Sequence, residues 1–282
     1  MPPIAYDPTS DSLLHPEDRQ SLFHRGPAQS REALAIEASR LAYLRFENSP
    51  MVLKQLEDEL ALAGYASVEV FEDNKTDGSG FGALHTDGSA LIAFRGTQAD
   101  RFPDWVTNAK FVQTKWDTGH VHSGFAKTAN GLWPKVDTWL KGPAKNRQSL
   151  LMCGHSLGAA IATLLAVRAK AQQLITLGSP RVGDNTFATS LNATPTLDIT
   201  RIVDCCDVVT EVPPPLMGYR HVGQQRYIDR DGVINNLNTI QIDADRIAAN
   251  FTYLTHDLKP GNAPSRGLAD HAPINYARAF WP

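Results

Sequence analysis

Apolar residues occur along the chain in two patterns, one typical of helices and one typical of buried strands. Apolar positions three or four residues apart favour an amphipathic helix, whereas a short, nearly continuous apolar run favours a buried strand. The first pattern predicts helices at 28–47, 50–62, 101–111, 126–140, 159–167, 184–191 and 270–280. The second predicts strands at 67–71, 80–85, 90–94, 150–153, 173–177, 197–203 and 219–229. Because strands alternate with helices, we expect a three-layer α/β domain with a mainly parallel central sheet.

The start of the chain and a stretch near its end do not follow this alternation of strands and helices. Residues 1–27 are rich in Pro, Asp and Ser, and we expect them to form an N-terminal arm on the surface. Residues 28–282 are expected to form a single domain, in which 234–268 is the least regular stretch and is predicted to be a variable insertion. Three large apolar residues of that stretch have the spacing of one helical face: Ile247, Phe251 and Leu254.

Composition narrows the class of protein. The 282 residues include 27 basic and 30 acidic side chains, so nothing predicts a nucleic-acid surface or a polybasic membrane anchor. No stretch approaches the ~20 apolar residues that a transmembrane helix needs. The first residues lack the pattern of a secretory signal, and three cysteines do not make a disulfide framework. A cytoplasmic location is therefore the default expectation, with signal-independent export or a trimmed signal as the alternatives.

Residues 149–167 combine a strand, a tight turn and a helix around one serine. The apolar run 150–153 leads into Gly-His-Ser-Leu-Gly at 154–158, and an alanine- and leucine-rich stretch follows. A G-x-S-x-G turn between a strand and a helix holds its serine in a strained conformation at the carboxyl end of a sheet. The amino end of the helix also points backbone N–H groups at that place. We therefore predict that Ser156 is a nucleophile.

A serine nucleophile needs a base that takes its proton and an acid that orients the base. On folds with this turn the order along the chain is serine, acid, histidine. Asp207 follows the predicted strand at 197–203 and opens a proline-rich loop, while Asp204 and then Glu211 are the alternative acids.

Three histidines follow Asp207 and are candidates for the base. His271 precedes the predicted last helix, where a loop can return over the carboxyl edge of the sheet. His256 and His221 are the alternatives. The anion formed on attack needs two preorganised donors. The N–H of Leu157 is one, and Thr97, which follows the predicted strand at 90–94, is the other.

Eight short motifs follow one another along the chain. They are FRGT at 94–97, DW at 104–105, VHSGF at 121–125, GHSLG at 154–158, GSPRVG at 178–183, RIVDCCD at 201–207, GYRH at 218–221 and DH at 270–271. Their order resembles that of the class 3 lipase family, and the resemblance runs from about residue 34 to residue 276.

The resemblance implies an α/β-hydrolase fold with a short lid segment at 98–108. It implies these roles: Ser156 nucleophile, Asp207 acid, His271 base, Thr97 and Leu157 oxyanion donors. It further implies supporting positions at Gly154, His155, Gly158, Asp104 and His221. The candidate lid residues are Phe102, Trp105 and Val106, although Trp105 and Val106 are equally suited to anchoring a helix to the core.

We therefore expect a serine carboxylester hydrolase that works through an acyl-enzyme, with acylglycerol lipids at a lipid–water interface as the leading substrates. Phospholipase A1 activity, a short-chain or feruloyl esterase, and an acyltransferase are alternatives. A non-catalytic lipase-like binding module is the alternative of another class. No metal or organic cofactor is expected, because this chemistry needs none. Asp-Arg-Asp-Gly at 229–232 lacks the ligand spacing of a calcium loop and is better interpreted as a turn.

Overall fold

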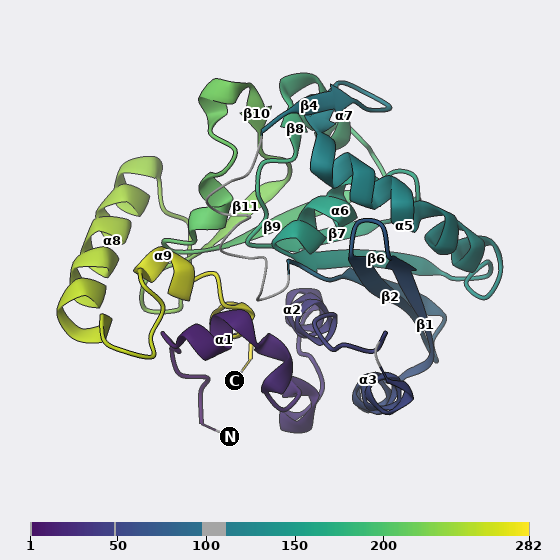
Figure 1. Ribbon diagram of the computed structural model, residues 1–282, viewed down its shortest axis with the longest axis horizontal. Helices are drawn as coiled ribbons and strands as arrows, with labels where there is room; N and C mark the ends of the chain where they lie inside the picture. The colour runs from purple at the N-terminus through teal and green to yellow at the C-terminus, as the bar shows by residue number, and fades with distance from the viewer. Residues whose placement is uncertain (1, 48, 98–110, 282) are drawn as a thin grey trace.

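Eight strands form one twisted central sheet in the order β1-β2-β3-β6-β7-β9-β11-β12 (Figure 1). The computed structural model describes residues 2–47, 49–97 and 111–281. Neighbouring strands from β3 to β11 are parallel, while β1–β2, β2–β3 and β11–β12 are antiparallel pairs. The strands are β1 Tyr65–Asp73, β2 Gly78–His85, β3 Ser89–Phe94, β6 Ser149–His155, β7 Gln173–Leu177, β9 Asp198–Asp204, β11 Gln224–Ile228 and β12 Ile234–Asn235. The mainly parallel sheet predicted from the sequence is confirmed.

Helices cover both faces of this sheet (Figure 1). The helices α2 (Arg31–Leu41), α3 (Pro50–Leu62) and α10 (Pro273–Ala277) share a core with one face. On the other face lie α5 (Ser123–Lys141), α6 (Leu157–Leu165) and α7 (Asn185–Asn192). The apolar run of β6 is continuous because successive side chains enter the two cores in turn, Leu151 and Cys153 on one side, Leu150 and Met152 on the other.

A second, smaller sheet, in the order β10-β8-β5-β4, lies on the side of the central sheet that α5, α6 and α7 cover (Figure 1). Its strands are β4 Gln113–Lys115, β5 His120–His122, β8 Gly183–Asp184 and β10 Tyr219–Arg220. The prediction of one strand over 219–229 is wrong, because β10 and β11 belong to different sheets. The chain changes direction between them at Gly223. This residue has φ +76°, and a Cβ added there would collide with Ile199.

Two predicted helices begin later in the chain than expected. The last helix does not span 270–280: α10 begins at Pro273, whose fixed φ and missing N–H suit the first turn of a helix, and the chain is extended at Ala272. The first begins at Arg31 rather than 28, because the side chain of Ser30 caps it by accepting from the Ala33 N–H. The predicted helix at 101–111 lies almost wholly outside the described residues.

The two ends of the chain lie side by side. The first 27 residues contain α1 (Ser10–Leu14) and two 3-10 turns, Pro16–Asp18 and Leu22–Arg25. The Asp7 N–H donates to the side chain of Asn275 in α10, and the Asn275 amide donates back to the Asp7 carbonyl. The N-terminal segment is thereby joined to the last helix (Figure 1).

The predicted insertion at 234–268 begins with β12 of the central sheet, and its residues 236–265 form a mainly helical projection at one end of the molecule (Figure 1). The helix α8 (Thr239–Thr252) begins with a capping box at Asn238 and continues into a π-helical turn, Tyr253–Asp257. A short helix, α9 (Arg266–Ala269), leads back to the sheet, and 3-10 turns at Val208–Glu211 and Pro215–Met217 complete this side. Within the described ranges, no helix has the length and apolar character that crossing a membrane requires.

Candidate active site

Ser156 occupies a strained turn between β6 and α6. Its φ of +59° lies in the left-handed region, and its N–H donates to the Leu177 carbonyl at 3.0 Å, which anchors the turn to β7. A Cβ at Gly154 would collide with the backbone of Gly158, so the turn needs glycine there. Ser156 Oγ is buried and makes no hydrogen bond with any described residue. The hydroxyl is therefore held in place by the backbone alone.

Asp207 and His271 form a buried pair at the carboxyl end of the sheet. His271 Nδ1 lies 2.8 Å from Asp207 Oδ2, and both side chains are almost fully buried. Asp207 Oδ1 accepts from the Val209 N–H at 2.8 Å, and the Tyr276 hydroxyl donates to Oδ2. Burial and the neighbouring Asp207 raise the pKa of Tyr276 well above its usual range, so its hydroxyl stays a donor. The carboxylate is thus oriented by three donors.

Gly178, just after β7, makes room for this pair. Its φ is +55°, and a Cβ on it would lie 2.7 Å from Asp207 Oδ2 and 2.9 Å from His271 Nδ1. Any side chain at this position would push the acid and the base apart. In the sequence Gly178 is visible only as the first residue of one motif, with nothing to show that it touches the pair.

His155 connects the elbow to the base. Its ring lies 4.3 Å from the His271 ring between centroids, and its Nε2 lies 2.8 Å from the His271 carbonyl. Burial and the adjacent His271 lower the pKa of His155 well below its usual range, so the ring is neutral. A carbonyl can only accept, so Nε2 carries the proton and Nδ1 accepts from the Tyr43 hydroxyl at 2.8 Å.

The alternative acids lie elsewhere. Asp204 is fully buried, and burial together with the nearby Asp270 raises its pKa well above the usual range, which favours the neutral carboxyl. Glu211 is half exposed and pairs with Arg246 at 3.0 Å. Of the three candidate acids, only Asp207 is seen to contact His271.

The alternative bases are also engaged elsewhere. His221 Nε2 lies 2.9 Å from the Thr210 carbonyl, in the 3-10 turn that follows Asp207. Burial and two nearby arginines, Arg201 and Arg181, lower the pKa of His221 to about 2. His256 is exposed in the π-helical turn, where it contacts Thr255 and the Thr252 carbonyl.

The predicted oxyanion donors lie at the same edge of the sheet as Ser156. Phe94 at the end of β3 pairs with Gly154 in β6. Thr97 and Ser156 come three and two residues after this pair, so both lie just past the carboxyl ends of their strands. Leu157 is the first residue of α6, where backbone N–H groups have no partner within the helix. Thr97 Oγ1 is buried and bonds to no residue of the described ranges. The predicted lid at 98–108, with Phe102, Asp104, Trp105 and Val106, lies outside the described residues.

Three residues of this site were missed by sequence reasoning: Tyr43, Tyr276 and Gly178 as a contact of the pair. Tyr43 belongs to the chain after α2 and bonds a residue 112 positions away. Tyr276 is 69 positions from Asp207. Tyrosine in a helical apolar pattern is ordinarily a core residue, so no local signal marks either hydroxyl.

Part of the chain is similar to a family of known proteins. Residues 91–217 match the family model described as Lipase (class 3). Secreted mono- and diacylglycerol lipase 1 of Fusarium solani is 29% identical over 194 residues, which is 58% of this chain and 55% of that protein. Secreted mono- and diacylglycerol lipase A of Penicillium camembertii is 30% identical over 179 residues, 60% of this chain and 57% of that protein. The chain spans little more than half the length of these curated relatives.

Solved lipase structures share the fold. The lipase from Rhizopus microsporus var. chinensis superposes with a TM-score of 0.58 and 27% identity over 70% of this chain and 72% of that one. Lipase II from Rhizopus niveus gives a TM-score of 0.60 and 22% identity over 84% of this chain and 95% of that one. The fold is therefore the α/β-hydrolase fold, as the sequence predicted.

The relatives correct one expectation. The default cytoplasmic location was drawn from the first residues and from the three cysteines. The Fusarium and Penicillium relatives are secreted lipases, which contradicts it. The reasoning failed because a low cysteine count does not determine location: a large α/β core needs no disulfides to be stable.

Proposed function

We propose that the protein is a serine carboxylester hydrolase that acts through an acyl-enzyme, a proposal that the match of residues 91–217 to the class 3 lipase model supports. The observation that carries the proposal is the position of the strained Ser156 turn next to the buried Asp207–His271 pair. His155, which precedes Ser156, stacks on the ring of His271, so the elbow and the base are neighbours.

In this proposal His271 removes the proton of Ser156 as Oγ attacks the ester carbonyl. Ser156 Oγ makes no hydrogen bond with His271 in the structure, and in this proposal that bond forms when substrate binds, since catalytic hydrogen bonds are often long or poorly aligned before binding. Asp207 holds the imidazole in the tautomer with its proton on Nδ1 and stabilises the imidazolium that forms. Protonated His271 then gives its proton to the leaving alcohol, and water repeats the cycle on the acyl-enzyme.

The negative charge that develops on the carbonyl oxygen is stabilised by the backbone N–H groups of Thr97 and Leu157. Leu157 lies at the amino end of α6, where the helix dipole also favours an anion. Each such donor is worth about 2.7–4 kcal/mol of transition-state stabilisation in a related hydrolase mechanism.

The leading substrates are acylglycerols presented at a neutral lipid surface, and α8 supports that proposal. Five large apolar side chains along α8 and its extension are exposed on one side: Ile240, Ile247, Phe251, Leu254 and Leu258. We call them the α8 stripe. Arg246 lies beside the stripe but pairs with Glu211, and the chain carries a formal charge of −3, which suits an uncharged oil surface better than an anionic membrane.

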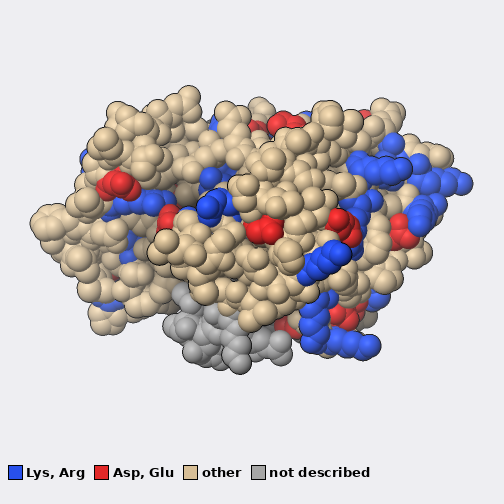
Figure 2. Space-filling model, turned by 90° about the horizontal axis from the view of Figure 1, so that it is seen from above, with Lys and Arg blue, Asp and Glu red and all other residues tan. Residues whose placement is uncertain are grey.

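The remainder of α8 is anchored to the protein. Ala249 and Tyr253 are buried. Arg246 bonds both Glu211 and the carbonyl of Cys205, which lies two residues before Asp207. A shallow hollow of about 650 Å³ lies beside the stripe, lined by Ile247, Phe251, Leu254 and polar neighbours. In Figure 2 the tip of this end is mostly uncharged, while Lys and Arg crowd the opposite end. Contact of the stripe with lipid would therefore hold the acid–base pair close to the surface.

Phospholipase A1 activity is the second candidate. Phospholipase A1-II 3 of Oryza sativa subsp. indica is 27% identical over 197 residues, which favours this alternative within the same ester chemistry. Parallel assays on a diacylglycerol emulsion and on phosphatidylcholine vesicles decide between them. A phospholipase releases fatty acid from the vesicles at a rate equal to or above that from the emulsion.

The decisive experiment replaces the nucleophile. Ser156→Ala is expected to lower p-nitrophenyl butyrate turnover by about 10⁴-fold or more, because the acyl-enzyme cannot form. Ser190→Ala, an exposed serine in α7, is the matched control and should retain wild-type turnover. A covalent phosphonate ester should label wild type at Ser156 and leave Ser156→Ala unlabelled. Full turnover in Ser156→Ala rejects the proposal, and an inert wild type that still binds lipid favours a non-catalytic module.

A further inference from the structure

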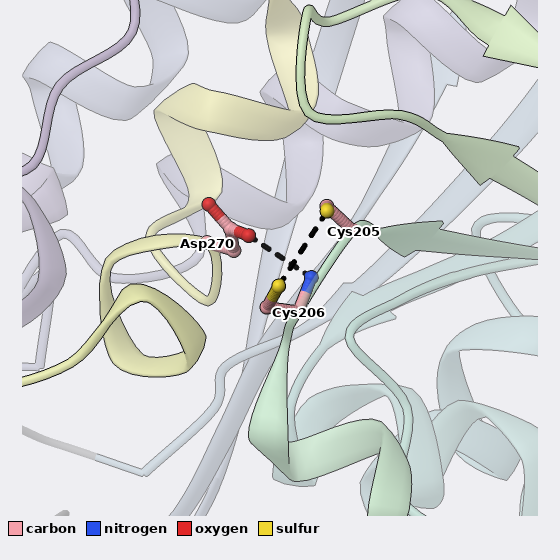
Figure 3. Close-up of side chains that lie close together, drawn as sticks. All are labelled: Cys205, Cys206 and Asp270. Atoms are coloured by element: carbon pink, nitrogen blue, oxygen red, sulfur yellow. Dashed lines mark hydrogen bonds between the residues drawn. The ribbon is translucent and has the colours of Figure 1, made fainter. Parts of the chain in front are cut away.

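Two adjacent cysteines lie in the turn that carries the acid of the proposed site. Cys205 and Cys206 connect β9 to the 3-10 turn Val208–Glu211, and their Sγ atoms are 3.5 Å apart (Figure 3). Neighbouring side chains on an extended strand point to opposite faces, so it is the turn that places both sulfurs together. Both thiols are free, Cys205 is buried, and Cys206 is partly exposed.

The sulfurs lie close to Asp270, which invites comparison with a metal site. Both oxygens of that carboxylate already have partners: Oδ1 accepts from Arg266 Nε at 2.7 Å, and Oδ2 accepts from the Cys206 N–H at 3.0 Å. The Arg266 guanidinium also brings a positive charge to the cluster, which disfavours a second cation there. What remains available is the pair of sulfurs.

The same turn connects the acid and the base. Asp207 directly follows Cys206, and His271 directly follows Asp270. The hydrogen bond from the Cys206 N–H to Asp270 therefore ties the turn before the acid to the turn before the base. Any rotation of the peptide between Cys205 and Cys206 moves this N–H and so changes how Asp207 and His271 meet.

Closing a bond between the two sulfurs requires such a rotation. The Sγ atoms must approach from 3.5 Å to about 2.05 Å, the length of a disulfide bond. Consecutive Cα atoms are ~3.8 Å apart, closer than the ~4.4–6.8 Å usual for a disulfide, so side-chain rotation alone does not suffice. A disulfide strained in this way is readily reduced, which makes the modification reversible.

We propose that Cys205 and Cys206 are a site of reversible oxidation by hydroperoxides, and that the oxidised form turns over ester more slowly. The Cys206 thiol loses its proton and the thiolate attacks a peroxide oxygen. The O–O bond breaks, a sulfenic acid forms, and the hydroxide that leaves takes up the thiol proton as water. Cys205 Sγ then attacks Cys206 Sγ, the S–O bond breaks, and the hydroxide leaves as water with the Cys205 proton. Two thiols and one hydrogen peroxide give one disulfide and two waters, the peroxide accepting both electrons.

The division of roles follows from exposure and surroundings. Cys206 is the accessible thiol, and the Asn250 side chain donates to its Sγ at 3.4 Å. Cys205 Sγ lies 3.4 Å from Asp245 Oδ2, and its hydrogen bond with Cys206 together with burial raises the pKa of the Cys205 thiol. Cys206 is therefore the group that meets peroxide, and Cys205 is the group that resolves the sulfenic acid.

The test treats the full chain with a phosphine reductant, removes it, and adds hydrogen peroxide. Thiols are then counted in denaturant, and the intact mass is measured. Of the three cysteines in the sequence, the reduced protein should show three thiols and the oxidised protein one, with a mass loss of two hydrogens. Turnover of p-nitrophenyl butyrate should fall about tenfold on oxidation, as expected for a lost hydrogen bond to a charged group, and dithiothreitol should restore it.

Matched variants separate this pair from the other oxidisable groups. Cys205→Ala should keep the turnover of the reduced protein and lose its sensitivity to peroxide. Cys153→Ala, which removes the buried thiol of β6, should stay as sensitive as wild type. Three thiols remaining in peroxide-treated wild type, or equal sensitivity in Cys205→Ala, overturns the proposal. So does zinc bound at one equivalent by the reduced protein and lost in Cys205→Ala.

The effect on turnover rests on the proposed hydrolase function, whereas the oxidation itself does not. If the pair oxidises as expected but neither form hydrolyses ester, the hydrolase proposal fails and the oxidation site stands. If the reduced protein hydrolyses ester and oxidation leaves its rate unchanged, the hydrolase proposal stands and the inferred coupling is rejected.

Discussion

The acid–base corner and the α8 stripe are built in opposite ways. In the corner, which comprises Gly178, Asp207, His271 and Tyr276, the side chains are buried and each oxygen of Asp207 has a donor. On the stripe, Phe251 is 68% exposed and the other members are open to solvent in the same way. Proton transfer requires fixed geometry, and only close packing fixes it. Contact with a fluid lipid surface requires area instead, so a change to the stripe should affect one kind of substrate and a change to the corner should affect all.

The largest effect is expected where packing is tightest. Gly178→Ala places a methyl group within 2.7–2.9 Å of Asp207 and His271 and must separate them. Turnover of soluble and emulsified esters should fall together, by about a thousandfold or more, because the imidazole loses its orienting acid. The measurement is kcat on p-nitrophenyl butyrate, with circular dichroism to confirm folding.

Gly261→Ala is the control for this change. Gly261 has φ +91°, but no atom lies within 4 Å of the position where a Cβ would be added. Both variants carry the cost of a left-handed alanine, about 1–2 kcal/mol, and only Gly178→Ala adds the collision. Similar turnover in the two variants would show that backbone strain, and not contact with the pair, governs this position.

On the stripe, the expected effect is smaller and selective. Phe251→Asp replaces an apolar contact with a charge and should weaken adsorption to a neutral emulsion by about 10- to 100-fold, since burying such a side chain is worth ~1.5–3 kcal/mol. Turnover of soluble p-nitrophenyl butyrate should not change. Adsorption is measured by depletion of protein from the aqueous phase, together with fatty-acid release from diacylglycerol.

Thr252→Asp adds the same charge to the same helix, one residue away and off the stripe. It should adsorb as wild type does. Equal loss in both variants would mean that charge alone, wherever it lies on α8, repels the surface. Loss of soluble-ester turnover in Phe251→Asp would show that the stripe, like the corner, affects all substrates, and the two regions would then not differ in this respect.

Local signals explain which parts were predictable from the sequence. The apolar run of β6, the two glycines around Ser156 and the helix after them are contiguous, so the elbow follows from residues next to one another. The order of Asp207 and His271 was predicted from the motifs, and the structure brings the two together. Tyr43, Tyr276 and the contact of Gly178 were missed because each joins strands or helices that only the folded chain brings together.

The stripe shows the other limit of sequence reasoning. The spacing of Ile247, Phe251 and Leu254 indicated one helical face, and α8 has that face. Spacing does not show whether another element covers the face, because that depends on how the chain packs around it. The prediction of one strand at 219–229 was wrong for a related reason. The segment does form strands, but the chain turns at Gly223, so its two halves belong to different sheets.

A smaller effect is expected from the group that holds His155. Tyr43→Phe removes the donor to Nδ1 of a buried, neutral imidazole and should cost about 1–3 kcal/mol of unfolding free energy. It should lower kcat by about tenfold at most, since His155 only positions His271, through the backbone carbonyl and by contact between the two rings. Tyr219→Phe is the control, because the buried Tyr219 hydroxyl bonds to no described residue. If the two variants lose equal stability, the Tyr43–His155 bond contributes nothing beyond burial of the ring.

The smallest effect on turnover is expected from His221, which lies beside the corner. It is compared with His256, which lies in the π-helical turn between Leu254 and Leu258 of the stripe. Burial and two arginines lower the pKa of His221 to about 2, against ~6.5 in the unfolded chain. Below about pH 6.5 the unfolded state therefore binds the extra proton, and His221 should cost the fold ~1.4 kcal/mol for each further pH unit, with no cost above. His221→Gln should remove that slope from urea-unfolding free energies measured across this range. The exposed His256→Gln should leave it in place. Parallel curves for wild type and His221→Gln would mean that His221 takes up its proton equally easily in both states, and that burial beside the acid turn sets no pH limit on the corner.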